Sequence, residues 1–482
     1  MLPLLPALFL LAATPEPNDL ETALKRFTSA LATVEREAAD PVASRQAIYE
    51  GAIPGMLRRL DPHTVFFNPD QFQQLKDMEQ STRKGFGSVV SVLPGRVIVL
   101  QSLPGTPSAR SGLSAGDEIL AVNDIALGQL DVEQLVGLLG ESRQQQARLV
   151  VRRPGNGRLL QFVLTPEEML TPSVERAFAV RTGIGYIRVA SFDAETGKQL
   201  REAIEKLGGA KLRALVLDLR NNPGGVLPAA LDTASLFLQP GQRILSIRGR
   251  AVQGKEEKVP EGATPYAFPL AVLINEKSAS ASEIVTGALQ DHDRAVIVGE
   301  ASFGKGLVQA VFPLTQGTGL ALTTAFYYTP SGRSIQRPLK TGQLEGHTEP
   351  VKEYRTDSGR VVRGGGGIEP DRLALPEEMT RLRAVIEASA SLPNFALEYT
   401  GRHPALAASF EVDGSLLDEF QSFLAQRRIQ PNVAEWSSDR DWIRSRLKEE
   451  IINQAFGVAK GDEVAIQRDP QVAIALGALG VR

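Results

Sequence analysis

The chain has 482 residues, of which 43% are hydrophobic and 23% charged, and its formal net charge is −3. This near balance of charges gives no electrostatic case for a nucleic-acid partner or a membrane surface. The length exceeds what one hydrophobic core usually supports, so two or three domains are expected. The chain has no cysteine, which excludes disulfides, and its four histidines are scattered without an HExxH pattern. We therefore expect no metal centre.

An apolar run, Leu2–Ala13, opens the chain. It has the length of a signal-peptide core and is too short to cross a bilayer. A basic flank is missing apart from the terminal amine, so a misassigned start or a short hydrophobic tail is the alternative. We expect residues 1–16 to be a signal peptide, cleaved near Ala12–Thr14, and the mature chain to be exported to a bacterial periplasm.

Residues 17–80 are expected to form an N-terminal helical domain. Asn18–Ala39 has apolar residues at helical spacing, and Ala43–Leu60 continues this pattern. Pro54 should kink or interrupt the second helix. His63 follows a proline and is expected to be a packed or turn residue rather than a catalyst.

A glycine-containing loop follows, in which backbone N–H groups could converge on an anion. The loop consists of Gly85, Phe86, Gly87, Ser88 and Val89. It resembles the carboxylate-binding loop of PDZ domains, and the later Ser111–Leu113 and Gly116–Asn123 resemble the turn and strand of that fold. The resemblance implies a PDZ domain over 82–167 that binds peptide C-termini, with Phe86 and Val89 making the pocket apolar and the peptide adding as a β-strand. A small β-rich domain without this function is the alternative.

Alternating strand and helix patterns from residue 168 onward predict a mixed α/β core. The expected strands are Gly183–Val189, Ala214–Leu219, Ala271–Asn275 and Val296–Val298, and the expected helices are Glu195–Leu207, Ala229–Phe237 and one that starts near Glu283.

Three serines, Ser278, Ser280 and Ser282, lie where the strand Ala271–Asn275 turns into a helix. A helix N-terminus carries partial positive charge and unpaired N–H groups, which suit a developing oxyanion. The alternative is structural, because Ser280 and Glu283 have the spacing of a capping box.

Lys305 lies between two glycines and enters the apolar run Leu307–Val311. A solvated lysine is unusual in this setting, although a lysine snorkelling from a strand edge is the alternative.

Taken together, Asn275, Ser278–Glu283, Gly304–Gly306 and Gln309 resemble the carboxyl-terminal processing peptidases, also called tail-specific proteases. The resemblance extends over about residues 50–375. It implies a serine endopeptidase without a cofactor, whose mixed α/β core over 168–375 resembles the crotonase and Clp-protease groups, with residues 50–80 packed on it.

The same resemblance assigns roles to individual residues. It makes Ser280 the nucleophile, Lys305 the general base and Gln309 the residue that orients the lysine. It also assigns the oxyanion donors to the amide of Ala281 and to a glycine amide after the strand Ala214–Leu219, which is Gly225 or else Gly224. An ordinary strand-to-helix turn is the alternative for these glycines. Lys305 must be neutral to accept a proton, so we expect burial to lower its pKa from the usual value of about 10.4.

Residues 376–482 carry no chemical motif and are expected to form a helical C-terminal extension. One amphipathic helix contains Leu416, Leu417, Phe420, Phe423 and Leu424, and another contains Ile443, Leu447, Ile451 and Ile452 and ends at Gly457. Such stripes form a core or subunit contacts, so we expect the extension either to pack on the protease core or to hold a homo-oligomer together.

A Ser-His-Asp triad with His292 is the rival catalytic arrangement. Twelve residues of helix separate it from Ser280, which is about 18 Å at 1.5 Å per residue. A general base must approach within about 3 Å, so the triad is disfavoured.

The leading hypothesis is therefore a multidomain α/β (α+β) periplasmic serine endopeptidase that captures protein or peptide substrates by their free C-termini and cleaves nearby, with an adaptor or lipoprotein as a further expected partner. A non-catalytic PDZ adaptor on an inactive protease scaffold is the second hypothesis. An acyl-CoA hydratase on the related crotonase fold is a weaker third, since it would need no PDZ module.

Overall fold

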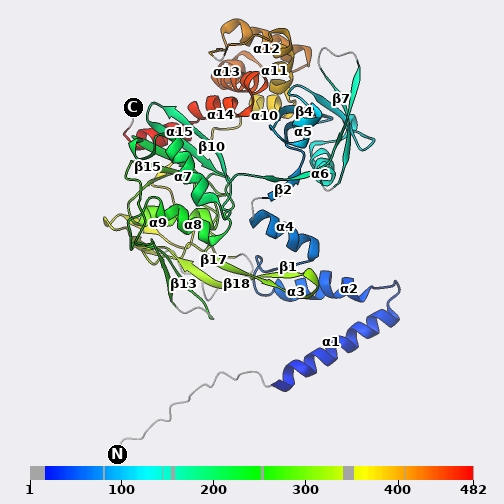
Figure 1. Cartoon of the computed structure of the whole chain (residues 1–482), viewed down its shortest axis with the longest axis vertical. Coiled ribbons are helices and arrows are strands. Elements are labelled where there is room, and N and C mark those ends of the chain that lie inside the picture. The colour runs from blue at the N-terminus through cyan, green and yellow to red at the C-terminus, as the bar shows by residue number, and fades with distance from the viewer. Residues whose placement is uncertain are drawn as a thin grey trace, which may run out of the picture. The chain divides into compact units, whose positions relative to one another are not determined.

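The structure is a computed structural model that describes residues 17–79, 82–143, 145–153, 158–250, 254–339, 352–407 and 409–480. The signal peptide predicted over 1–16 lies outside the described residues. The chain divides into two compact units, and Figure 1 labels many of their elements. One unit holds the chain up to Pro69 together with Gln309–Thr323, and the other holds Asp70–Val308 and Thr324–Arg482.

The first unit is largely helical. Helix α1 spans Pro17–Glu37, and a second helical stretch consists of α2 (Ser44–Gln46), a π-helical turn (Ala47–Ala52) and α3 (Ile53–Leu57). The sequence predicts that Pro54 kinks or interrupts this stretch, and the structure has a π-helical turn just before it, with Pro54 in the first turn of α3.

One short strand of the first unit, β1 (Val65–Phe67), pairs antiparallel with Gly319–Ala321 at the start of β18. The loop before β1 is fixed by Asp61, whose carboxylate accepts hydrogen bonds from the backbone N–H groups of His63 and Thr64, both at 2.8 Å. His63 is thus a turn residue, as the sequence predicts.

The second unit is built around a six-stranded sheet. Its first strand is antiparallel to the second, and the remaining neighbours are parallel. In spatial order the strands are β10 (Val174–Arg181), β11 (Ile184–Val189), β12 (Ala214–Asp218), β15 (Leu270–Ile274), β16 (Val296–Gly299) and β21 (Arg372–Leu373).

Both faces of this sheet are buried, which is why its strands are nearly continuous apolar runs. In β12, Leu215 and Leu217 pack toward one hydrophobic core and Ala214 and Val216 toward another. Helices α7 (Thr196–Leu207), α8 (Leu227–Ser235) and α9 (Ala281–Asp291) contribute to the first core, and α15 (Pro470–Ala478) contributes to the second. Figure 1 shows α15 in red beside β15.

A second sheet has the order β1-β18-β13-β14, and β17 also pairs with β18. The bounds of these strands are β13 (Arg243–Arg248), β14 (Lys255–Lys258), β17 (Leu307–Pro313) and β18 (Gly319–Tyr328). A separate two-stranded sheet consists of β19 (Glu353–Arg355) and β20 (Val361–Arg363), and the 3₁₀ turn η3 (Gly209–Lys211) lies between α7 and β12.

Residues 88–164 form a separate antiparallel sheet with its own hydrophobic core. Its order is β3 (Ser88–Leu93), β4 (Arg96–Ser102), β5 (Glu118–Val122), β7 (Ala147–Arg152) and β8 (Leu159–Leu164), with β6 (Ile125–Ala126) beside β5. The adjoining elements are α4 (Pro69–Glu79), β2 (Thr82–Gly85), α5 (Pro107–Ser111), α6 (Val132–Ser142) and β9 (Glu167–Leu170).

The C-terminal region has its own hydrophobic core, which is made by aliphatic and aromatic side chains of four helices. These helices are α10 (Arg381–Ala388), α11 (Ser391–Arg402), α12 (Gly414–Gln426) and α13 (Val433–Phe456), followed by α14 (Val458–Gln467). Both predicted stripes are buried, and α13 ends at Gly457 with a φ of 87°. The last helix, α15, packs on the central sheet, which agrees with the expectation that the extension packs on the core, although the sequence did not single out this helix.

Candidate active site

Three turns that carry the predicted catalytic residues follow neighbouring parallel strands. The turn after β12 contains Gly224 and Gly225, the turn after β15 contains Ser280, and the turn after β16 contains Lys305. Because parallel strands end at the same edge of a sheet, the topology gathers these turns at one edge, where α/β folds usually bind ligands. The serine turn lies on the central strand of the three.

The serine corner distinguishes Ser280 from its two neighbours. Ser278 and Ser282 are fully buried, and their hydroxyls donate to the carbonyl oxygens of Leu219 (2.8 Å) and Asn222 (3.0 Å). Ser280 is half-buried and has φ 55° and ψ −114°, a strained conformation for a residue other than glycine. Strain of this kind persists only where the surrounding structure holds it, and of the three serines only Ser280 has such a backbone conformation.

The carboxylate of Glu283 holds the corner together. It is completely buried and accepts hydrogen bonds through Oε2 from the backbone N–H groups of Ser280 (2.8 Å) and Lys305 (2.9 Å). Its Oε1 accepts from the Gly304 N–H (2.7 Å) and the Ser302 hydroxyl (2.5 Å). One carboxylate oxygen therefore brings the Ser280 and Lys305 backbones next to each other.

Burial raises the pKa of the Glu283 carboxyl, while the hydrogen bonds from Ser302, Lys305, Gly304 and Ser280 act in the opposite direction. The sequence predicted Glu283 only as the partner in a capping box with Ser280. The structure confirms the hydrogen bond from the Ser280 N–H to the Glu283 side chain, and the Glu283 N–H in turn donates to the Ser280 carbonyl oxygen (2.8 Å). No sequence signal pointed to the bonds with residues 302–305.

A buried tyrosine also touches the serine turn. The Tyr327 hydroxyl donates to the carbonyl oxygen of Ser280 at 3.3 Å, and its ring is almost completely buried. Burial, together with the charge of Glu283, raises the pKa of Tyr327 well above its usual value, so the hydroxyl stays protonated and remains a donor.

The glycine turn after β12 approaches the serine corner closely. A Cβ added to Gly224 would lie 2.8 Å from the Ser280 Cβ and 2.9 Å from the Ala281 nitrogen, so only glycine fits at this position. Gly224 and Val226 bond to Phe192 as in a parallel β-bridge, which turns the Gly225 N–H to the opposite side. Within the described part of the chain, the N–H groups of Gly225 and Ala281 donate no hydrogen bond.

Lys305 is half-buried, and close packing explains the glycines on either side of it. A Cβ on Gly304 would lie 2.9 Å from the Arg337 side chain, and one on Gly306 would lie 3.0 Å from the Gln336 nitrogen. Gln309 belongs to the other compact unit, in which its Nε2 donates to the carbonyl oxygen of His63 at 2.6 Å.

The rival base, His292, follows the C-terminus of α9. Its Nδ1 lies 2.7 Å from the Asp357 carboxylate and its Nε2 lies 2.8 Å from the Arg243 carbonyl oxygen. Both ring nitrogens therefore have partners outside the serine corner, and His292 fits a structural role at the helix end.

The glycine loop at 85–89 lies at the edge of the antiparallel sheet. Gly87 has φ 75°, and a Cβ there would lie 2.2 Å from the Thr106 Cβ. The carbonyl oxygens of Phe86 and Gly87 accept hydrogen bonds from the N–H groups of Ser108 and Leu103, both at 2.8 Å. Neither the Phe86 N–H nor the Gly87 N–H donates to any residue that the structure describes.

The loop leads into β3, the first strand of its sheet, and α6 packs beside that strand. Phe86 packs against the core of the sheet, and Val89 is half-buried. Val132 and Val136 on α6 are exposed. Two unused amide donors, an edge strand and apolar side chains are thus found together, which are the features that strand-addition binding needs.

Among the described residues, no helix is long and apolar enough to span a membrane, and no group of three or more His, Cys, Asp or Glu side chains is placed to hold a metal ion.

Comparison with known proteins finds two families within the chain. Residues 183–344 match peptidase family S41, and residues 98–153 match the PDZ domain. A carboxy-terminal-processing protease of Bartonella bacilliformis is 37% identical over 298 residues, which cover 60% of this chain and 68% of the relative. A carboxyl-terminal-processing protease of Synechocystis sp. is 34% identical over 303 residues, which cover 62% and 70%.

Among solved structures, a photosystem II D1 C-terminal processing protease has 28% sequence identity and a TM-score of 0.39, with 72% of this chain and 92% of that chain covered.

The chain is accordingly a serine-type peptidase with a mixed α/β core and a PDZ domain. It belongs to peptidase family S41 and, within that family, to the carboxy-terminal processing proteases. The family and fold class predicted from the sequence are confirmed.

Proposed function

We propose that Ser280 is the nucleophile of this protease and that Lys305 is its general base. The observation that carries the proposal is a pair of hydrogen bonds to one oxygen. Glu283 Oε2 accepts from the backbone N–H groups of both residues. Ser280 is also the serine of its turn with the strained backbone, whereas the neighbouring hydroxyls serve as structural donors.

In this mechanism the neutral Lys305 amine takes the proton of the Ser280 hydroxyl as the oxygen attacks the scissile carbonyl carbon. The C–N bond then breaks, and the lysine gives the proton to the leaving amine. A water molecule, activated by the same lysine, hydrolyses the acyl-enzyme and regenerates the serine.

The negative charge that develops on the carbonyl oxygen needs donors that are already in place. The Gly225 and Ala281 amides have no other acceptor within the described residues, and Ala281 begins α9, whose dipole favours negative charge. Each such donor is worth about 3 kcal/mol of barrier. In the proposal Gln309 orients the lysine, as the resemblance to the family implies, and its carboxamide nitrogen donates to the His63 carbonyl oxygen.

The substrates that we propose are proteins and peptides with free, apolar C-termini. The carboxylate would bind the Phe86 and Gly87 amides, and the last residues would add to the edge of β3. Ser88 and Val89 complete the predicted binding loop. Cleavage would then occur upstream of the captured end. Family membership favours this enzyme over the non-catalytic adaptor.

The domain division remains the one predicted from the sequence, with a signal peptide over 1–16, a helical domain over 17–80, a PDZ domain over 82–167, a protease core over 168–375 and a helical extension over 376–482. Export to the periplasm rests on the Leu2–Ala13 run. Mass spectrometry of the mature N-terminus tests it, since an intact Met1 would contradict export. An adaptor or lipoprotein partner and a homo-oligomer stay predictions.

Identification of the reactive serine tests the catalytic assignment. A fluorophosphonate should label the protease at Ser280, and fragmentation of the tryptic peptide that runs from Ser278 to Arg294 distinguishes the three serines. Label on Ser278 or Ser282, or equal labelling of Ser280→Ala, would refute the assignment.

A further inference from the structure

The last described helix, α15, belongs to the protease core although it lies more than ninety residues beyond the core's last strand in sequence. Its apolar residues Val472, Ala475 and Leu476 pack against side chains from β11, β12, β15 and β16. The N-terminus of α15 therefore comes close to the end of β12, where the glycine turn begins.

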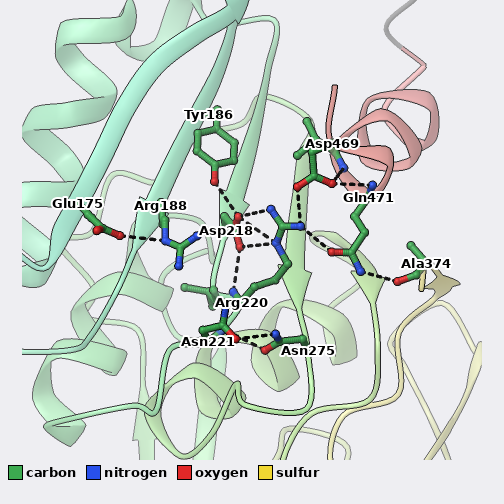
Figure 2. A network of polar contacts seen from close by, with 12 residues as sticks. Glu175, Tyr186, Arg188, Asp218, Arg220, Asn221, Asn275, Ala374, Asp469 and Gln471 are labelled. Carbon is green, nitrogen blue, oxygen red and sulfur yellow. Dashed lines mark hydrogen bonds and ion pairs between the residues drawn. The ribbon is translucent and has the colours of Figure 1, made fainter. Parts of the chain in front are cut away.

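Arg220 contacts polar residues at the start of this helix (Figure 2). Its side chain is 12% exposed and forms ion pairs with Asp218 at 2.6 Å and Asp469 at 2.7 Å. One of its terminal nitrogens also donates to Gln471 Oε1 at 2.5 Å, and the Gln471 Nε2 donates to the Ala374 carbonyl oxygen at 2.6 Å. Two residues from the start of α15 therefore fix the position of this guanidinium.

Asp218 is the buried carboxylate that pairs with Arg220. It is fully buried at the end of β12 and accepts from the Arg220 backbone N–H (2.9 Å) and the Tyr186 hydroxyl (2.7 Å). Burial by itself would lower the pKa of Arg220, but the two carboxylates outweigh that effect and raise it, so the guanidinium is charged at every relevant pH.

Arg220 is also the first residue of the turn that carries the glycines. The next residue, Asn221, has a left-handed φ of 59°, and it exchanges two hydrogen bonds with Asn275 at 2.8 and 2.9 Å, as Figure 2 shows. Asn275 begins the serine turn, because its N–H donates to the Ser278 hydroxyl at 2.9 Å. The side chain of Asn222 accepts from the Gly224 N–H at 2.8 Å.

We propose that Asp469 and Gln471 are positioning residues for catalysis, which act through Arg220 on the turn that bears the Gly225 amide. In this proposal the helix α15 helps to set the geometry of the active site. The inference rests on the proposed role of Gly225 as an oxyanion donor. Because the reacting oxygen and its donor must align closely, a shift of about 1 Å in this turn is enough to cost up to 10²-fold in rate.

Asp469 allows a variant that separates positioning from helix capping. Its Oδ1 caps α15 by accepting from the N–H groups of Gln471 (2.8 Å) and Val472 (3.2 Å), while its Oδ2 pairs with Arg220. Asparagine and serine are both good N-caps, so Asp469→Asn and Asp469→Ser retain the helix start and remove the ion pair.

The matched control is Asp462→Asn. Asp462 on α14 pairs with Arg176 on β10, so it also joins the C-terminal region to the central sheet. Arg176 does not lie on the strand that leads into the glycine turn. This control removes an ion pair of the same kind without touching the proposed line of contacts.

The experiment measures kcat and KM of the full-length variants on a quenched fluorescent peptide with a free apolar C-terminus, with circular dichroism to establish folding. We expect both Asp469 variants to lose about tenfold in kcat with KM within about twofold, because the scissile bond and not the captured end is misaligned. The rate of Ser280 labelling by a fluorophosphonate should fall by the same factor. Asp462→Asn should retain kcat within about twofold.

Wild-type kcat in both Asp469 variants, or an equal loss in Asp462→Asn, would overturn the inference. If Asp469→Ser does not fold, the kcat values of Asp469→Asn and Gln471→Met test the inference instead. Gln471→Met loses the side-chain hydrogen bonds to Arg220 and Ala374 but retains the ion pair between Asp469 and Arg220. Full activity in Ser280→Ala would instead refute the proposed function, so the two failures are distinguishable.

Discussion

The serine corner and the glycine loop at 85–89 both offer backbone N–H groups to a negatively charged oxygen, but they are built differently. At the corner, the donors sit among fully buried polar groups: Glu283, Ser278 and Ser282 hold three separate turns at fixed distances. In the loop, two backbone hydrogen bonds to residues 103–108 hold the chain, and the donors face the open edge of a sheet.

The difference corresponds to two kinds of task. A site that stabilises a transition state needs donors that do not move during the reaction, which a buried and fully bonded network provides. A site that only captures a peptide end gains from an accessible strand edge and tolerates adjustment. The corner should therefore be sensitive to single-atom changes, whereas the loop should respond mainly to changes in the ligand.

The largest effect is expected from Ser280→Ala, which removes the proposed nucleophile. Peptide cleavage should fall by at least about 10⁴-fold, as in serine proteases that lose this residue. Circular dichroism should be unchanged because the side chain is only half-buried. Residual activity above that level in purified protein would break the account of the corner.

The next largest effect is expected from Glu283→Gln, which changes one oxygen into an N–H₂ group of nearly the same shape. Each of the two carboxylate oxygens accepts two hydrogen bonds, so the N–H₂ group of the glutamine would lie against two hydrogen-bond donors. We expect a loss of about 2–5 kcal/mol in the free energy of unfolding and of at least about 10²-fold in kcat.

Glu276→Gln is the control, because Glu276 is exposed on the same turn. Thermal unfolding and steady-state kinetics of both variants decide the matter. Unchanged stability and activity in Glu283→Gln would show that the corner does not depend on its buried carboxylate.

A smaller effect is expected when the C-terminus of a peptide substrate is amidated. The amide removes charge-assisted hydrogen bonds to the loop, each worth about 1.5–3 kcal/mol, so kcat/KM should fall by about 10–100-fold. Gly87→Ala should bring the two peptides closer together in rate, because its Cβ would displace Thr106 and the loop. Equal rates for the free and amidated peptides on the wild-type protein would refute capture by the carboxylate.

The smallest effect is expected in the stability of the C-terminal helices, which lie outside the serine corner and the glycine loop. Its pH dependence serves as a reference for pH effects at those two sites. The two tryptophans, Trp436 and Trp442, both lie in α13, so their fluorescence reports unfolding of the C-terminal helices alone. Burial raises the pKa of Glu450 on this helix to about 7, against the lowering effect of Arg446. The folded state then binds a proton that the unfolded state releases above its pKa of about 4.3.

The stability of these helices should therefore decrease as the pH rises from about 4.5 to about 7 and level off above that range. A fluorescence-monitored melting temperature should follow this course in the wild type and be flatter in Glu450→Gln. An identical pH profile in the variant would contradict it. pH effects on activity that exceed this baseline can be assigned to the active site.

The sequence was sufficient to predict the elements that local patterns define. The apolar runs of β12, β15 and β16, the serine corner and the stripe of α12 were all visible as periodicity and turn chemistry. The resemblance to a known family supplied the roles that we propose for Ser280 and Lys305.

What the sequence did not reveal depends on contacts between distant positions. Gln471 reaches Arg220 across 251 positions, and nothing in the pattern of α15 distinguishes a helix that covers the central sheet from one that joins the C-terminal helices. Glu283 looked like a capping residue because its bonds to residues 302–305 form only when β15 and β16 are paired.

The central claim is that Lys305 supplies the base for Ser280, and the pH dependence of kcat/KM for three proteins tests it most directly. An ammonium cannot accept the serine proton, so wild-type activity should rise with pH through one ionisation well below the usual lysine pKa of about 10.4. Lys305→Ala and Lys305→Arg should both lose about 10²–10⁴-fold, since a guanidinium does not deprotonate. If folded Lys305→Ala kept more than about a tenth of the wild-type activity and the same pH profile, the dyad would be wrong.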